Sequence, residues 1–142
     1  MLRPSRSEDM DEIVEIWLLA SLQAHDFVDA SCWWQAQEDL RTRYLDRARI
    51  WVFEERGELL GFMALADDYL AALFVRPDRQ GRGVGHALLQ EAKLQGARLH
   101  ARVFVENEQA VRFYRRRGFV IEREEFDPLT GHPQYKMCCE SA

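Results

Sequence analysis

The chain has 142 residues, about the length of one domain, and 47% of them are hydrophobic and 30% charged, as in a globular protein with a core. A formal net charge of −5 argues against a dedicated nucleic-acid-binding protein. No apolar run reaches the length of about 20 residues that a bilayer requires, and acidic residues follow the N-terminus where a secretory signal would be apolar.

The cysteines indicate the compartment. Cys32, Cys138 and Cys139 form neither a CxxC pair nor a metal-ligand spacing, and their odd number excludes a complete disulfide framework. We therefore expect a single domain over residues 1–142, in the cytoplasm, with no metal site and neither a nucleic acid nor a membrane as partner.

The first half of the chain predicts a short strand over residues 2–4, followed by two helices. Ser7 stands where it would cap the first helix, whose apolar residues recur at helical spacing. A loop over residues 25–27 leads to a second helix over residues 32–44. Apolar runs over residues 50–55 and 59–66 predict a hairpin. A tight turn then enters a central strand over residues 69–75, which Pro77 ends.

The second half alternates helices and strands. A glycine-rich turn opens a helix over residues 83–95, and a strand follows over residues 99–105. Asn107 caps the next helix, which ends near Arg117 because Gly118 supplies the left-handed stop. Strands over residues 120–126 and 135–139 pair across a turn. The order β-α-α-β-β-β-α-β-α-β-β predicts an α/β (α+β) fold, a mixed sheet with helices on both faces.

The glycine-rich turn, residues 79–86, lies between a predicted strand and a predicted helix. Unpaired amides at a helix start favour anions, and glycines let a phosphate approach the backbone. The Walker pattern fails because no Gly-Lys-Ser/Thr follows. The dinucleotide pattern fails because His86 or Leu88 replaces its last glycine. A phosphate-bearing ligand is the functional interpretation, and a turn that merely tolerates glycine is the structural one.

Two motifs in order carry a family resemblance. The segment Gln80-x-x-Gly83-x-Gly85 resembles motif A of the GCN5-related N-acetyltransferases (GNAT), and Asn107-x-x-Ala110-x-x-x-Tyr114-x-x-x-Gly118-Phe119 is similar to motif B. The resemblance covers residues 2–137 and is best over residues 50–119. Segments 25–27, 51–53 and 70–75 narrow it to small bacterial acetyltransferases of the YiaC/YjaB type.

The resemblance implies a GNAT fold. Its sheet has about seven strands, mostly antiparallel, and about four flanking helices, with a central V-shaped splay between the strands at residues 69–75 and 99–105. It also implies that acetyl-coenzyme A lies in this splay. Its pantetheine would contact Leu73, Phe74, Val75, Asn107, Ala110 and Phe113. Its pyrophosphate would contact Gln80, Gly81, Arg82, Gly83, Val84, Gly85 and His86.

By the same resemblance, Tyr114 matches the general acid that protonates the departing thiolate. Its structural alternative is a helix tyrosine packed into the core. The basic run Arg112, Arg115, Arg116 and Arg117 is either a solvated helix end or a contact for the 3′-phosphate of the coenzyme.

The acceptor side is less defined by the sequence. We expect His25, Asp26, Phe27, Trp33 and Tyr69 to border the acceptor, with Trp34 and Tyr135 as further candidates for a pocket lining. His25 is a candidate general base or a cap of the second helix, and Asp68, Tyr69 or an ordered water are alternatives for the base. Acidic residues around the presumed mouth would attract a cationic amine.

The function expected from this resemblance is acetyl transfer to a primary amine by direct attack, because no cysteine lies in a nucleophile setting. Protein lysine side chains are the expected acceptors. A small amine such as a polyamine, amino acid or antibiotic is the alternative. A non-catalytic acyl-coenzyme A-binding module and a nucleotide-binding regulator are rival hypotheses. The chain is expected to be a monomer or a homodimer.

Overall fold

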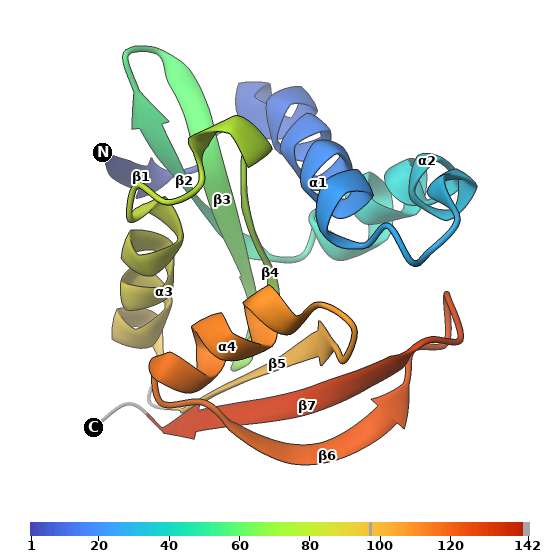
Figure 1. Ribbon diagram of the computed structural model, residues 1–142. Coiled ribbons are helices and arrows are strands. Elements are labelled where there is room, and N and C mark those ends of the chain that lie inside the picture. The colour runs from blue at the N-terminus through green and yellow to red at the C-terminus, as the bar shows by residue number, and fades with distance from the viewer. Residues whose placement is uncertain (97, 141–142) are drawn as a thin grey trace.

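The computed structural model describes residues 1–96 and 98–140, with the side chains of residues 43, 44 and 140 left aside. Within this part of the chain, seven strands form one sheet in the order β1-β2-β3-β4-β5-β7-β6 (Figure 1). The strands are β1 (Leu2–Pro4), β2 (Arg49–Glu55), β3 (Glu58–Ala66), β4 (Tyr69–Val75), β5 (Arg98–Phe104), β6 (Val120–Phe126) and β7 (Pro133–Glu140). All neighbours pair antiparallel except β4 and β5, which are parallel. The expected mixed, mostly antiparallel sheet is confirmed.

Helices cover both faces of this sheet, as expected. They are α1 (Met10–Ala24), α2 (Ala30–Asp39), α3 (Val84–Gln95) and α4 (Glu108–Arg116), with short helical turns η1 (Ser7–Asp9), η2 (Leu40–Tyr44) and η3 (Pro77–Arg79). Helices α1 and α2 share one buried cluster with β2, β3 and β4. Helices α3 and α4 share a second buried cluster with β5 and β7.

The helix starts differ from the sequence prediction. Ser7 caps no helix, because it lies inside η1 and α1 begins at Met10. Asp9 holds this corner instead: its Oδ2 accepts from the Arg6 amide at 2.7 Å and pairs with Arg3 Nη1 at 2.9 Å. The second helix begins at Ala30, two residues before the predicted start, because the carboxylate of Asp29 accepts from the Ser31 amide at 2.9 Å.

Strand positions follow the prediction more closely. The bounds of β1, β4 and β6 agree with it, and β2, β3 and β5 each begin one residue earlier. Strand β7 begins two residues earlier, at Pro133. Gly118 adopts φ +92°, which confirms the left-handed stop after α4.

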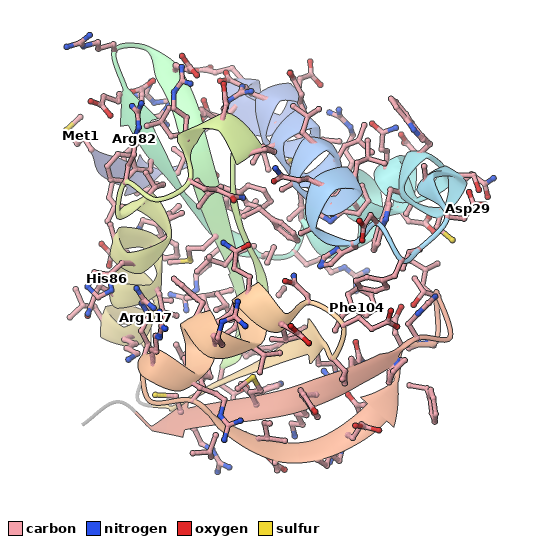
Figure 2. All side chains as sticks on the ribbon, viewed as in Figure 1. Met1, Asp29, Arg82, His86, Phe104 and Arg117 are labelled. Carbon is pink, nitrogen blue, oxygen red and sulfur yellow. The ribbon has the colours of Figure 1, made fainter. Side chains whose placement is uncertain are left out.

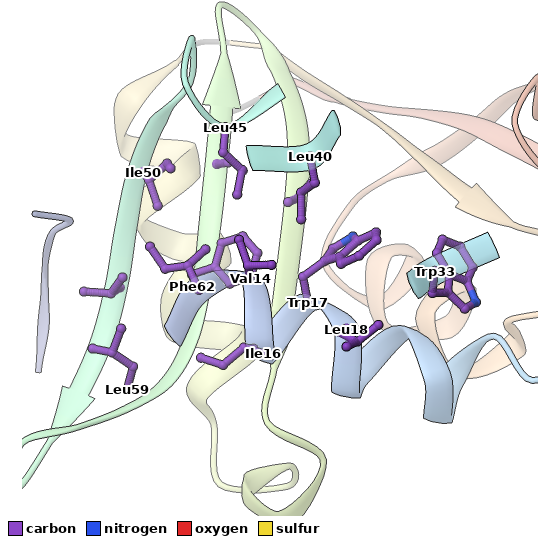
Figure 3. Close-up of a cluster of buried hydrophobic side chains, with 14 of the residues drawn as sticks. Val14, Ile16, Trp17, Leu18, Trp33, Leu40, Leu45, Ile50, Leu59 and Phe62 are labelled. Atoms are coloured by element: carbon purple, nitrogen blue, oxygen red, sulfur yellow. The ribbon is translucent and has the colours of Figure 1, made fainter. Parts of the chain in front are cut away.

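The cluster on the α1 side anchors the loop that follows α1. Figure 3 shows Val14, Trp17 and Leu18 of α1 in this cluster, together with Phe62 of β3. Trp17 meets Trp33 of α2 edge-on, with ring centroids 5.7 Å apart. Burying such a side chain contributes about 1.5–3 kcal/mol. The two helices are therefore fixed to each other and to the sheet, and the loop between them has a defined place.

Strands β4 and β5 separate soon after they begin. Their described register has one pair, Tyr69 with His100, beside which the His100 amide donates to the Asp68 carbonyl at 3.0 Å. The β3–β4 register shifts between Ala64, opposite Ala72, and Leu65, opposite Leu70, which leaves one extra residue in β4. Such a bulge bends a strand and increases its twist. The predicted V-shaped splay is confirmed.

Candidate active site

The open edge of β4 exposes backbone donors toward the splay. The Arg76 amide donates to the Leu60 carbonyl of β3 at 2.8 Å. Because amides alternate in direction along a strand, those of Leu73 and Val75 point to the opposite edge, where β5 has diverged. An extended chain placed in the splay could pair with both. The expected contacts of the pantetheine therefore have suitable donors.

The glycine-rich turn leaves room beside its backbone. Gly81 and Gly83 both have φ +81°, and a Cβ built on either would meet no atom within 4 Å. Gly83 is the N-cap of α3, whose first helical hydrogen bond runs from the Ala87 amide to the Gly83 carbonyl at 3.0 Å. The amides of residues 84–86 precede that bond, at the positive end of the helix dipole. This turn has the donors and the space that a pyrophosphate requires.

Gly85 joins the three elements around the site. A Cβ at Gly85 would lie 3.5 Å from the Phe113 ring of α4 and 3.6 Å from Val75 at the end of β4. The start of α3 thus packs between the open strand and α4. The splay, the phosphate turn and α4 meet there.

Side chains of the predicted phosphate segment have different positions. Arg82 is exposed, whereas Val84 is buried in the core, so Val84 can offer a ligand only its amide. His86 accepts at Nδ1 from Arg117 Nε at 3.1 Å (Figure 2). The Arg117 guanidinium also lies over the Phe113 ring, 4.0 Å from its centroid.

The other arginines of the basic run differ from Arg117 in their exposure to solvent. Arg112, Arg115 and Arg116 are exposed on α4, as the solvated-helix interpretation expects. Arg117 is half-buried and turned toward α3, where Lys93 Nζ donates to its carbonyl at 2.6 Å. Arg117 is therefore the member of the run that joins α4 to the phosphate turn.

Tyr114 lies on the buried side of α4. It is 8% exposed, and its ring contacts Phe113 and Phe119 edge-on at centroid distances of 5.3 and 5.1 Å. Burial raises the pKa of its phenol above the ordinary value, so the hydroxyl retains its proton at neutral pH. Asn107, Ala110 and Tyr114 fall on one helical face, because they are spaced i, i+3, i+7. Asn107 Oδ1 caps this helix by accepting from the Ala110 amide at 3.2 Å.

The loop between α1 and α2 carries an aromatic cluster. The His25 ring lies between Phe27, Trp33 and Phe104, at centroid distances of 5.8, 5.4 and 4.8 Å. Asp26, Phe27 and Trp33 line an open surface depression, together with Leu22, Val28, Asp29 and Ala30. The structure thus brings four of the five expected acceptor residues to one place.

Two further aromatic candidates lie elsewhere. Trp34 is 57% exposed and contributes nothing to this depression. Tyr135 packs into the cluster beneath α3 and α4, on the other face of the sheet from Trp33. Helical and strand periodicity explain the separation, because Trp34 is one residue past the inward-facing Trp33 and Tyr135 shares its strand face with Met137.

His25 does not cap the second helix, because Asp29 does. It is 8% exposed, and its Nε2 lies 3.0 Å from Asn107 Nδ2. Burial lowers its pKa to about 4, against a smaller opposing effect of Asp26. The imidazole is therefore neutral at physiological pH.

Tyr69 marks the closed end of the splay. Its ring stacks on His100 at a centroid distance of 4.8 Å, and the Arg102 guanidinium lies 5.3 Å from its centroid. Asp68 Oδ1 approaches His100 Nδ1 at 3.4 Å. Sequence reasoning missed His100, Arg102 and Phe104, although their alternate spacing in a predicted strand places them on one face.

Among the described residues, no group of three or more histidine, cysteine or acidic side chains is arranged to hold a metal ion. None of the helices described is long and apolar enough to cross a membrane.

Comparison with known proteins identifies the class. A family model described as "Acetyltransferase (GNAT) domain" matches residues 46–121. The peptidyl-lysine N-acetyltransferase YiaC of Escherichia coli is 36% identical over 122 residues, which are 85% of this chain and 84% of YiaC. The peptidyl-lysine N-acetyltransferase YjaB of E. coli is 40% identical over 130 residues, 90% of this chain and 88% of YjaB.

Solved structures of two proteins have a fold similar to that of this chain. Apo YjaB from E. coli superposes with a TM-score of 0.87 and 34% identity, covering 100% of this chain and 98% of that one. The PaiA N-acetyltransferase of Thermoplasma acidophilum, in complex with coenzyme A, has a TM-score of 0.81 over 99% of this chain and 98% of its own. At 16% identity the second likeness concerns the fold alone.

The chain belongs to the GNAT family of acetyltransferases. It is accordingly an N-acetyltransferase, with acetyl-coenzyme A as its acetyl donor. The resemblance to the YiaC/YjaB type is confirmed.

Proposed function

We propose that this chain acetylates the side-chain amine of lysine in peptides or proteins, by direct transfer from acetyl-coenzyme A. The observation that carries the proposal is the packing at Gly85, where the end of β4, the start of α3 and Tyr114's helix α4 come together. In this proposal the strand amides, the helix-start amides and the phenol of Tyr114 act on one bound acetyl-coenzyme A. The names of YiaC and YjaB support lysine as the acceptor.

The residues of the junction take separate roles in this proposal. The amides of Leu73 and Val75 hold the pantetheine, and the Val75 amide polarises the thioester carbonyl, because the Phe74 amide points to β3. The turn from Gln80 to His86 holds the pyrophosphate. Asn107, Ala110 and Phe113 line the pantetheine path.

Proton transfer falls to Tyr114. The neutral amine nitrogen attacks the thioester carbon, a C–N bond forms, the C–S bond breaks, and the nitrogen gives up one proton to water. Tyr114 gives its proton to the departing sulfur and regains one from solvent. The phenol carries its proton at neutral pH, as an acid must when the sulfur leaves.

The shape of the acceptor side favours lysine on a protein. The depression lined by Asp26, Phe27 and Trp33 is open to solvent, whereas sites for small molecules usually enclose most of the ligand. Asp26 and Asp29 are exposed at its edge and would attract a cationic side chain. Tyr69 does not line this depression; it lies at the closed end of the splay, where it stacks on His100.

The test compares acceptors by release of the coenzyme A thiol. We expect an Nα-blocked lysine peptide to be acetylated with a higher kcat/KM than spermidine or free amino acids. The same peptide with arginine at the lysine position is the control, because a guanidinium is always charged and is no nucleophile. A higher kcat/KM for spermidine would replace the lysine proposal with a small-amine function. Thermal protection by nucleotides but not by acetyl-coenzyme A would favour a regulator.

We further infer the setting of the enzyme. Residues 1–142 would form one domain, because the described strands belong to one sheet. The thiols of Cys32 and Cys138 are in no disulfide, which suits the reducing cytoplasm. The net charge of −5 speaks against a nucleic-acid partner. A monomer or a homodimer fits, the latter through the edge strands β1 and β6.

A further inference from the structure

A hydrogen bond joins the two sides of the candidate site. His25, in the loop after α1, and Asn107, at the start of α4, are 82 positions apart in the sequence, and their Nε2 and Nδ2 atoms are 3.0 Å apart. Asn107 Oδ1 is already committed to the Ala110 amide, so the Asn107 side chain directs its NH₂ group at the imidazole. Since Nδ2 can only donate, His25 Nε2 accepts, and the ring proton of the neutral imidazole lies on Nδ1.

The surroundings hold the His25 ring in this role. Trp33 and Phe104 lie against it, at centroid distances of 5.4 and 4.8 Å, and the side chain is 8% exposed. The Nδ1 atom is buried and has no hydrogen-bond partner among the described residues. A charged imidazolium would be poorly stabilised here and could not accept from Asn107.

The same contact argues against His25 as the general base. A base needs a free lone pair within reach of the amine. The lone pair of Nε2 points at Asn107, and Nδ1 carries the proton. The lowered pKa, about 4, would make the imidazole a weak base in any case.

The bond connects the acceptor loop to the helix of the proposed acid. Asn107 caps α4, and Tyr114 follows seven residues later on the same helical face. Loss of the bond would leave a part-buried Asn107 donor unsatisfied and would loosen the first turn of the helix. A donor left unsatisfied away from water is unfavourable, because nothing replaces the hydrogen bond it has lost.

We propose that His25 is a positioning residue, whose neutral imidazole accepts from Asn107 and so fixes the start of α4, and with it Tyr114, against the acceptor loop. This inference rests on the proposed role of Tyr114. It assigns His25 a function that differs from both interpretations of the sequence, base and helix cap.

Two substitutions at His25 separate the possibilities. His25→Phe keeps an aromatic ring in the cluster but removes the acceptor, whereas His25→Gln removes the ring but retains an acceptor. We expect kcat to fall about tenfold in H25F, which corresponds to a loss of about 1.4 kcal/mol, and to remain within about threefold of wild type in H25Q. An equal loss of kcat in both variants would indicate that His25 is a base. Wild-type kcat in H25F would mean that the His25 ring acts only by packing. Either result overturns the proposal.

A double-mutant cycle tests the partner. Asn107→Ser retains an N-cap hydroxyl but cannot reach His25. If the two residues act through one bond, the H25F and N107S losses in kcat will not multiply in the double variant. Multiplied losses would show independent roles and refute the link.

A measurement without turnover keeps this inference distinct from the proposed function. The nitrogen NMR shifts of His25 in the wild-type protein should show the neutral tautomer with the proton on Nδ1 from pH 5 to 8. A proton on Nε2 would refute the bond, whatever acceptor the enzyme uses. Failure to acetylate a lysine peptide, with this tautomer present, would refute the acceptor alone.

Discussion

Two glycines with the same backbone conformation provide a matched test of the phosphate turn. Gly83 has φ +81° at the start of α3, and Gly57 has φ +79° in the β2–β3 hairpin. A Cβ at either position would meet no atom within 4 Å. Alanine at either site therefore costs only backbone strain, about 1–2 kcal/mol in the left-handed region.

The two substitutions should differ in coenzyme binding. At Gly83 the new methyl group enters the space where the pyrophosphate is proposed to meet the backbone, and the strain disturbs the amides of α3. Losing one hydrogen bond to a charged group costs about 1.5–3 kcal/mol. We therefore expect Gly83→Ala to weaken acetyl-coenzyme A binding about 10- to 100-fold, and Gly57→Ala to leave it unchanged.

Two assays distinguish an effect on coenzyme binding from an effect on stability. Urea unfolding should show similar losses of stability in both variants, and calorimetric titration with acetyl-coenzyme A should show weakened binding in G83A alone. Wild-type affinity in G83A, with the expected loss of stability, would refute the placement of the pyrophosphate. Equal loss of affinity in G57A would show that the effect is one of general stability.

The other predictions concern proton transfer, stability and self-modification. Tyr114→Phe should lower kcat about 10²-fold or more, as expected for the loss of a general acid, while the Kd for acetyl-coenzyme A stays the same; an unchanged kcat would refute the acid role. Hydrogen bonds from Arg3 hold the pKa of Asp9 below its ordinary value, so Asp9 stabilises the fold above the unfolded-state pKa of about 3.9, and this contribution is lost as pH falls through the folded-state pKa. Asp9→Asn should therefore lower the free energy of unfolding by about 2 kcal/mol at pH 7, and the difference should shrink toward pH 2 in urea titrations; a constant difference would contradict this. The chain has two lysines against 17 arginines: Lys93 donates to a backbone carbonyl at 2.6 Å and Lys136 pairs with a carboxylate at 3.6 Å. We expect these contacts to protect both lysines from self-acetylation. Mass spectrometry after incubation with acetyl-coenzyme A should find the enzyme unmodified while a lysine peptide is consumed. Acetylation of either lysine at the rate of the peptide would show that the contacts do not protect it.

Local features of this chain could be predicted because they depend on neighbouring residues. Pro77 ends β4, Asn107 caps α4, and Gly118 closes that helix in a left-handed conformation. Pro77 and Gly118 act through their own backbone preferences, and the Asn107 cap acts through a side chain that bonds within its own turn, so these signals can be recognised from neighbouring residues. The order of elements followed from these signals and from apolar periodicity, and the two motifs identified the family.

The error at Ser7 arose because another side chain holds the same corner. Ser7 has the side chain of a good cap, but Asp9 holds the corner because Arg3 and Arg6 meet its carboxylate. No local rule reveals that β1 brings Arg3 to this place. The same limit applies to Trp34 and Tyr135, whose positions depend on which helix or strand face turns inward.

Propensity, capping and spacing act between residues that are close in the sequence, so the elements, their order, the glycine turn and the motif that contains Tyr114 could all be predicted. The role of His25 could not. Its burial, its lowered pKa and its bond to Asn107 exist because α1 and α4 pack on opposite sides of a sheet that opens between β4 and β5. Desolvation and hydrogen bonding depend on distance in space, and a separation of 82 positions in the sequence gives no sign of a 3.0 Å contact.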